Sequence, residues 1–367
     1  MHLLKYTGSR ACGMMRLSLM YPNSYIGILN LSALPLYHLI SSPIHSAAPQ
    51  TSPFQLRSPN VEENPPKGKM SSPNYSPADL RADLERDGFI FIKSLLTPAQ
   101  LTPLRQASAE AVALARSGQW PHVRTVGKQF PPWSASDIPF HGIWGVQHLL
   151  NPSLPHARLF AETYFSSAVL DIAKALLDCA DDELVMELFN MLVRPETDFA
   201  LRWHRDDIPA GASDEGERLR LAEPAFHAQY NLALYEDSSL VVVPGSHRRA
   251  RTATERGADP MADHLPGQVE VRMEAGDIVF YDNNILHRGV YDASKERMTL
   301  HGSIGHVRGQ KLRARNVLQH GVGAWVGECD FGRLGGGGPV GERAEGMRRR
   351  LVEMGRDGTD LGYSLVG

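Results

Sequence analysis

The spacing of hydrophobic and polar residues divides the chain into a helical part followed by a strand-rich part. Apolar residues recur at helical intervals over three segments, 77–87, 98–117 and 166–179. Ser76 and Pro77 supply an N-cap and a first-turn proline for the first of these helices, and Gly88 ends it. Residues 119–156 show no clear period, so we expect loops and short elements there.

Strand-like patterns dominate from about residue 183 onward, where short apolar or alternating runs are bounded by Gly, Pro, Asp or Asn. The predicted strands are 89–92, 183–195, 200–207, 226–236, 238–247, 268–282 and 296–307. Because no helical pattern interrupts the later segments, they favour an antiparallel sandwich or barrel over a parallel sheet with crossover helices. The expected fold class is therefore mainly β with flanking helices (α+β).

The start of the chain differs in composition from the rest. Residues 1–77 hold ten of the 25 prolines, and no acidic residue precedes Glu62. A basic, acid-free start is typical of a mitochondrial transit peptide, and a disordered or gene-model extension is the alternative. The protein is thus expected to be cytoplasmic, or mitochondrial if this segment is a targeting signal. Prolines and asparagines interrupt the apolar stretch 16–40, which argues against a membrane span.

We therefore expect three parts: a disordered or targeting extension over 1–74, a globular domain with N-terminal helices over 75–334, and a Gly-rich turn with a C-terminal helix packed on that domain over 335–367. A formal net charge of −3 gives no sign of a nucleic-acid or membrane partner, so a small molecule is the expected partner. The three cysteines lie far apart, which argues against a disulfide framework and favours a reducing compartment. The oligomeric state is left open.

A candidate metal site lies in the stretch RWHRDD (202–207). On a strand, residues two apart point to the same face, so His204 and Asp206 can present an imidazole and a carboxylate to one point while Arg205 points away. His287, in GDIVFYDNNILHRG, offers a third ligand. Two histidines and one carboxylate form the facial triad of non-haem Fe(II) sites, although such a pair alone is also common as a surface feature.

A candidate anion-binding site begins at Arg297, ten residues after His287. Alternation in ERMTLHGS places Arg297 and Thr299 on one face of a strand. An arginine aimed toward the metal can hold a dicarboxylate through two hydrogen bonds, and the threonine hydroxyl can add a third. The alternative for Arg297 is an ion pair at the rim with Glu296 or Asp292.

Taken together, the motifs resemble those of the phytanoyl-CoA dioxygenase family. These motifs are WHRDD (203–207), SSLVVVPGSH (238–247), GDIVFYD (276–282), HRG (287–289) and RMT (297–299), and the resemblance covers about 75–310. It implies a double-stranded β-helix (jelly roll, cupin-like) and an Fe(II)-dependent enzyme that uses 2-oxoglutarate as co-substrate together with O2.

The resemblance also implies roles for single residues. His204, Asp206 and His287 would be the iron ligands, and Arg297 with Thr299 would bind the distal carboxylate of 2-oxoglutarate. The chain departs from the family at Gly289, where members often carry a serine that contacts the co-substrate. Halogenating relatives lack the carboxylate ligand, so its presence favours hydroxylation, desaturation or ring closure.

Further candidates surround this site. The strand 226–236 gathers His227, Gln229 and Asn231 on one face, which points either to solvent or into the site as cofactor contacts. The aromatic-rich segment 128–150 is predicted to be a lid over the pocket. Four weaker candidates for substrate contacts are Gln129, Trp133, Trp203 and Asn190. His247, in the PGSH segment, is expected to close a strand and not to bind metal.

The sequence predicts an oxygenase that hydroxylates or otherwise oxidises a small organic substrate and releases succinate and CO2. Two alternatives stay open: a hydrolase that holds zinc with the same ligands, and a jelly-roll binding module without catalysis. The residues do not identify the substrate, nor whether it is a CoA ester.

Overall fold

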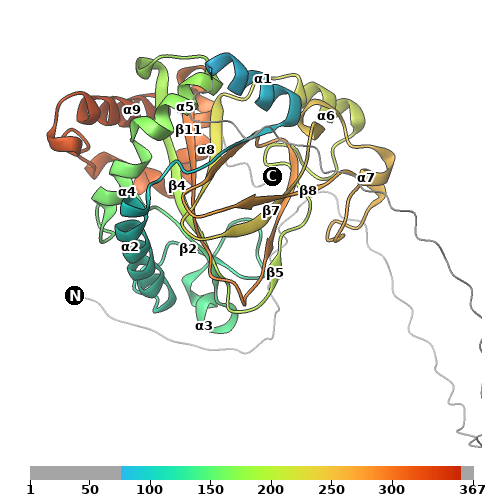
Figure 1. The fold of residues 1–367 in the computed structure, drawn as a ribbon, viewed down its shortest axis with the longest axis horizontal. Helices are drawn as coiled ribbons and strands as arrows, with labels where there is room; N and C mark the ends of the chain where they lie inside the picture. Colours follow the sequence, from blue (N-terminus) through green and yellow to red (C-terminus); the bar gives the residue numbers. More distant parts are fainter. Residues whose placement is uncertain (1–75, 357–367) are drawn as a thin grey trace, which may run out of the picture. The chain divides into compact units, whose positions relative to one another are not determined.

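Two antiparallel sheets form the framework of the computed structural model, which describes residues 76–356 (Figure 1). The larger sheet has the strand order β1-β9-β6-β11-β4-β3-β2, and the smaller one has the order β5-β10-β7-β8. The strands are β1 (Phe89–Ile92), β2 (Val123–Thr125), β3 (Ile143–Val146), β4 (Leu184–Val193), β5 (Phe199–Ala200), β6 (His227–Ala233), β7 (Asp237–Val243), β8 (Val269–Met273), β9 (Ile278–Tyr281), β10 (Leu286–Tyr291) and β11 (Met298–His306). The predicted fold class, a mainly β jelly roll with flanking helices, is confirmed.

Most of the helices cover the larger sheet. They are α1 (Pro77–Asp87), α2 (Pro98–Arg116), α3 (Ile138–His141), α4 (Ala157–Tyr164), α5 (Ser167–Leu177), α6 (Asp214–Leu221), α7 (Ala253–Gly257), α8 (Gln310–Gln319) and α9 (Pro339–Gly355). Helices α8 and α9 contact β4, α2 contacts β3, and α5 contacts β6 and β11 (Figure 1). The main apolar core lies between these helices and the sheet, which leaves the opposite face of the sheet free to line a site.

The three helices predicted from apolar spacing are present, and local chemistry explains their ends. The Ser76 hydroxyl accepts a hydrogen bond from the backbone N–H of Asp79 at 3.2 Å, and Gly88 ends α1 with a φ of +81°. The sequence pattern did not reveal α6, α7 or α8, and the first two interrupt the region read as continuous strands. Helix α8 was missed because it buries only Ala314 and Val317.

The predicted strand 200–207 is wrong in most of its length. Only Phe199–Ala200 pairs with β10, followed by one isolated bridge between His204 and His287. The backbone N–H of Leu201 donates to the carbonyl of Gly289 at 2.8 Å, and that of His204 donates to the carbonyl of His287 at 3.0 Å. Between these two hydrogen bonds the chain advances by three residues on this segment but by only two on β10. This extra residue is a bulge, a device that turns side chains toward a site.

The predicted lid over 128–150 is also wrong in its second half. Residues Ile143–Val146 form β3 in the larger sheet, and Trp144 is buried. Residues between Gln129 and Trp133 lie along the pocket described below, and Trp144 and Gln147 line it from β3 and the residue that follows this strand.

The extension over 1–74 lies outside the described residues, so its nature and the cytoplasmic or mitochondrial location stay predictions. The domain boundaries stay predictions as well. None of the helices within residues 76–356 has the length and hydrophobicity needed to cross a lipid bilayer.

Candidate active site

A pocket of about 1310 Å³ opens between the two sheets. Its walls come from strands of both sheets, from the segment that leads from β2 to Trp133, and from α8. His204, Asp206 and His287 line it, as do the predicted co-substrate residues Arg297 and Gln229. Positions far apart in the sequence therefore meet in one cavity.

The three predicted metal ligands face one another. One ligand atom from each of His204, Asp206 and His287 lies within 4.8 Å of the others, and no other such cluster occurs within the described residues. The Oδ1 atom of Asp206 is 3.5 Å from Nε2 of His204 and 3.7 Å from Nε2 of His287. The two imidazole rings are 4.3 Å apart between centroids.

Backbone carbonyls fix both imidazoles in the orientation a metal requires. Nδ1 of His204 lies 2.8 Å from the carbonyl of Arg202, and Nδ1 of His287 lies 2.8 Å from the carbonyl of Ile285. A carbonyl only accepts, so each Nδ1 carries the proton and each Nε2 presents its lone pair toward Asp206. Burial holds the pKa of His204 well below its ordinary value, and His287 lowers it further. His204 is thus neutral, as a ligand must be.

The carboxylate of Asp206 is held by two elements. Its backbone N–H donates to the carbonyl of Asn283 at 2.9 Å, and Nε2 of Gln229 donates to Oδ2 at 3.0 Å. Oδ1 is left to face the two imidazoles. Two nitrogens and one carboxylate oxygen on one side of a point, with the pocket on the other, fit a non-haem Fe(II) centre with open positions.

Arg297 lines the same pocket, is buried, and has one N–H donor that no described residue uses. It is 5% exposed, and its guanidinium lies 4.4 Å from the ring centroid of Tyr291. Its Nε donates to Oδ2 of Asp237 at 3.0 Å, whereas Nη1 has no hydrogen-bond partner within residues 76–356. Burial lowers the pKa of Arg297, but Asp237 and Tyr291 more than offset this, so its pKa is raised. An unpaired buried N–H on a fixed cation suits the carboxylate of a ligand.

Asp237 is the functional neighbour that the sequence did not reveal. Burial raises its pKa, but the charge of Arg297 and the hydrogen bonds from Thr299 and Ser239 bring the pKa below its ordinary value. The hydroxyl of Thr299 donates to this carboxylate, and Thr299 does not line the pocket. In this arrangement Thr299 therefore supports Arg297 through Asp237 and has no proton left for a ligand carboxylate.

The glycine that departs from the family pattern makes room for an aromatic ring. A Cβ atom at Gly289 would lie 2.8 Å from the Tyr291 ring, which is closer than real side chains approach. Without that atom, the ring of Tyr291, the last residue of β10, lies over Gly289 and stacks on Arg297. The ring thus takes up the space beside Gly289.

The predicted substrate residues divide into two pairs. Gln129 and Trp133 line the pocket. Trp203 does not: its indole donates to the carbonyl of Ala262 at 2.9 Å and packs in a separate apolar cluster, because the bulge turns it away from the triad. Asn190 is also outside the pocket lining, and its side-chain oxygen accepts from the backbone N–H of His148 at 3.0 Å.

The polar face of β6 points into the pocket and not to solvent. His227, Gln229 and Asn231 all line it. Asn231 already has a protein partner, since its side-chain oxygen lies 2.8 Å from Nδ1 of His301. His247 is buried and lies 3.0 Å from the carbonyl of Glu85 through Nε2, which matches the structural role expected for it.

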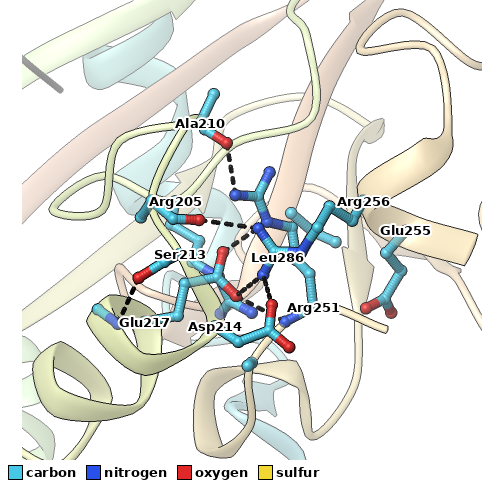
Figure 2. Close-up of polar contacts among 12 residues, drawn as sticks. Arg205, Ala210, Ser213, Asp214, Glu217, Arg251, Glu255, Arg256 and Leu286 are labelled. Atoms are coloured by element: carbon cyan, nitrogen blue, oxygen red, sulfur yellow. Dashed lines mark hydrogen bonds and ion pairs between the residues drawn. The ribbon is translucent and has the colours of Figure 1, made fainter. Parts of the chain in front are cut away.

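A buried ionic network supports the metal-binding segment from behind. Figure 2 shows Glu217 between Arg251 and Arg256. Glu217 is fully buried and lies 3.1 Å from Nη2 of Arg256. Arg205, between the two ligands His204 and Asp206, donates to the carbonyls of Ser246, Asn284 and Arg249. These bonds tie the segment to the loops that follow β7 and β9.

Comparison with known proteins gives a family match. The family described as phytanoyl-CoA dioxygenase (PhyH) matches residues 84–298, which is more than half of the chain. None of the curated proteins matches the sequence.

Several solved structures resemble this one weakly. EctD from S. alaskensis, solved with 2-oxoglutarate and 5-hydroxyectoine, is 19% identical with a TM-score of 0.47, over 68% of this chain and 83% of EctD. AviO1 from Streptomyces viridochromogenes Tue57 is 18% identical with a TM-score of 0.45, over 64% and 96%. HygX from Streptomyces hygroscopicus, solved with nickel and 2-oxoglutarate, is 16% identical with a TM-score of 0.44, over 62% and 86%. At this level of similarity they carry no argument about substrate or reaction.

Proposed function

The chain belongs to the phytanoyl-CoA dioxygenase family, and on that premise we propose that it is a non-haem Fe(II)- and 2-oxoglutarate-dependent oxygenase acting on a small organic substrate. The observation that carries the proposal is the triad itself. His204, Asp206 and His287 bring their ligand atoms within 4.8 Å of one another, with both Nε2 atoms oriented by carbonyls bound at Nδ1.

Each residue has a task that follows from its contacts. His204, Asp206 and His287 would hold the metal, and the bond from Gln229 keeps one oxygen of Asp206 turned toward it. Arg297 would bind the distal carboxylate of 2-oxoglutarate through its unpaired Nη1.

Iron bound there would activate O2, so that one oxygen atom oxidises a C–H bond of the substrate while 2-oxoglutarate becomes succinate and CO2. The protein contributes positioning: the pocket holds substrate, co-substrate and metal side by side.

Anaerobic addition of Fe(II) and 2-oxoglutarate to the metal-free protein tests this function. We expect a weak visible charge-transfer band that needs both additions, followed by succinate release when O2 enters. Asp206→Ala is the matched control, and it should lose the band while keeping the circular dichroism spectrum of the fold.

Other outcomes identify the rival functions. Hydrolytic turnover with zinc, with 2-oxoglutarate left unconsumed, would identify a hydrolase that uses the same ligands. Absence of both the band and any turnover in a metal-loaded protein would leave a binding module.

A further inference from the structure

Arg124, on β2, is one of several cations of the pocket wall, and none of residues 76–356 forms an ion pair with it. Its guanidinium lies 5.4 Å from the ring centroid of Trp133 and 5.1 Å from that of Trp144. Among residues 76–356, no carboxylate lies within ion-pairing distance of it, and its buried Nε has no hydrogen-bond partner. Stacking on two indoles fixes the plane of the guanidinium but leaves its N–H donors unused.

Three other arginines of the pocket pair with carboxylates of the protein. Arg297 pairs with Asp237 at 3.0 Å, and Arg220 pairs with Asp207 at 3.2 Å. Arg313 forms a two-bond pair with Glu187, one bond measuring 2.6 Å. Arg124 therefore differs from these three in facing the cavity without a carboxylate from the protein.

The neighbouring strand is shaped to admit this side chain. Gly145 on β3 stands opposite Arg124 in the register, and a Cβ atom there would lie 3.0 to 3.2 Å from the Cδ, Cβ and Cγ atoms of Arg124. The absence of a side chain at Gly145 lets the aliphatic part of Arg124 cross the strand toward the two tryptophans.

A second unused donor lies on the same segment. The side-chain oxygen of Gln129 accepts from the backbone N–H of Arg202 at 3.0 Å, which orients the amide. Its Nε2 is buried and has no partner within the described residues, and Gln129 lines the pocket. Leaving two buried donors unsatisfied is costly unless a ligand supplies the acceptors.

We propose that Arg124 and the Nε2 of Gln129 bind the carboxylate or phosphate group of an anionic organic substrate, whose apolar body lies against the aromatic wall of the pocket. This inference rests on the proposed oxygenase function, because the bound anion is the molecule to be oxidised. It assigns the substrate class that the family and the triad leave open.

Calorimetric titration of the protein loaded with Ni(II) and saturating 2-oxoglutarate tests the proposal without turnover, and the co-substrate keeps the probes away from Arg297. The probes are 3-phenylpropionate, phenyl phosphate and the neutral 3-phenylpropionamide. We expect at least one anion to bind about 10- to 100-fold more tightly than the amide, the range of a charge-assisted hydrogen bond. Whichever of the two anions binds with the higher affinity indicates whether the substrate carries a carboxylate or a phosphate group.

Variants show whether this preference belongs to Arg124. Arg124→Gln should abolish the preference for anions, and Arg124→Lys should keep only part of it, because a point charge lacks the planar fork. Arg308→Gln is the matched control: it removes a positive charge from the same pocket, over the ring of Phe226, and should keep the preference.

Three results would overturn the inference. These are equal binding of anions and amide to the wild type, an unchanged preference in Arg124→Gln, or a loss of 2-oxoglutarate affinity in that variant in place of probe affinity. Failure of the proposed function shows separately, as the absence of the Fe(II) charge-transfer band in the wild type.

Discussion

Asp237 places a buried negative charge beside the arginine that would receive 2-oxoglutarate. It pairs with Arg297 at 3.0 Å, and it also accepts the hydroxyl proton of Thr299. The carboxylate keeps the guanidinium neutralised and oriented before a ligand arrives. Its charge also sets how strongly a second carboxylate can bind, because Arg297 must serve both.

Asp237→Asn should destabilise the ligand-free protein by about 3–5 kcal/mol, since it leaves the Arg297 charge buried and unpaired. 2-Oxoglutarate should then restore more stability to the variant than to the wild type, because its carboxylate replaces the lost charge. Urea unfolding with and without 2-oxoglutarate measures both effects. Thr299→Val is the control, with an expected loss of about 1 kcal/mol. An equal gain from the ligand in variant and wild type would separate Asp237 from the co-substrate site.

Gly289→Ala tests the ring that packs on Arg297. The new Cβ would lie 2.8 Å from Tyr291, so the ring must leave its place over the guanidinium. We expect roughly 10-fold weaker binding of 2-oxoglutarate with unchanged metal binding, from the lost cation–π contact. The Fe(II) charge-transfer titration measures the two affinities. Gly211→Ala is the control, because a Cβ there meets no atom within 4 Å.

At the scale of elements, the sequence predicts correctly those features that neighbouring residues determine, such as the ends of helices. The cap at Ser76 and the left-handed Gly88 mark the ends of α1 in the sequence as in the structure. The segment 200–207 alternates like a strand, but its pairing depends on β10, which is distant in the sequence and reaches it through the bridge between His204 and His287. One extra residue before His204 interrupts the hydrogen bonds between this segment and β10, and no pattern within the segment itself predicts that interruption.

Helix α6 follows the predicted metal ligands His204 and Asp206 in the chain and fixes the position of that segment. Its Glu217 is fully buried between Arg251 and Arg256 (Figure 2). Glu217→Gln removes the charge that both arginines share, so we expect a loss of about 3–5 kcal/mol of unfolding free energy and weaker metal binding. Glu215→Gln, on the exposed side of the same helix, should change neither quantity. Metal affinity unaltered in a destabilised Glu217→Gln variant would show that the network serves the fold alone.

At the scale of the molecule, the candidate site exists only where the two sheets meet. Arg297 lies immediately before β11 of the larger sheet, whereas Asp237 is the first residue of β7 in the smaller one. His204 and His287 were predictable because their motif carries them in a fixed order. The Asp237–Arg297 pair and the partnerless Arg124 were not predictable, because the packing of strands distant in sequence determines which charges become neighbours.

Two histidines with lowered pKa values, His148 and His320, tie the stability of the molecule to pH. Burial lowers the pKa of His148 to about 4 and that of His320 to about 4, against 6.5 for an ordinary imidazole. Between pH 6.5 and 4 the unfolded chain therefore binds protons that the folded chain does not, so stability falls as the pH falls. Above pH 7 both states are unprotonated at these sites, and the effect vanishes.

The contribution of one such histidine can be isolated. For a folded pKa of about 4, lowering the pH from 7.5 to 5 should cost about 2 kcal/mol through His320. The difference in unfolding free energy between these two pH values, measured with urea on the metal-free protein, should therefore shrink by about that amount in His320→Gln. Asn316→Gln, at a side chain of the same pocket that does not titrate, should leave the difference unchanged. If the difference in unfolding free energy were as large in His320→Gln as in the wild type, the pKa of His320 in the folded protein would not be lowered from the ordinary value of 6.5.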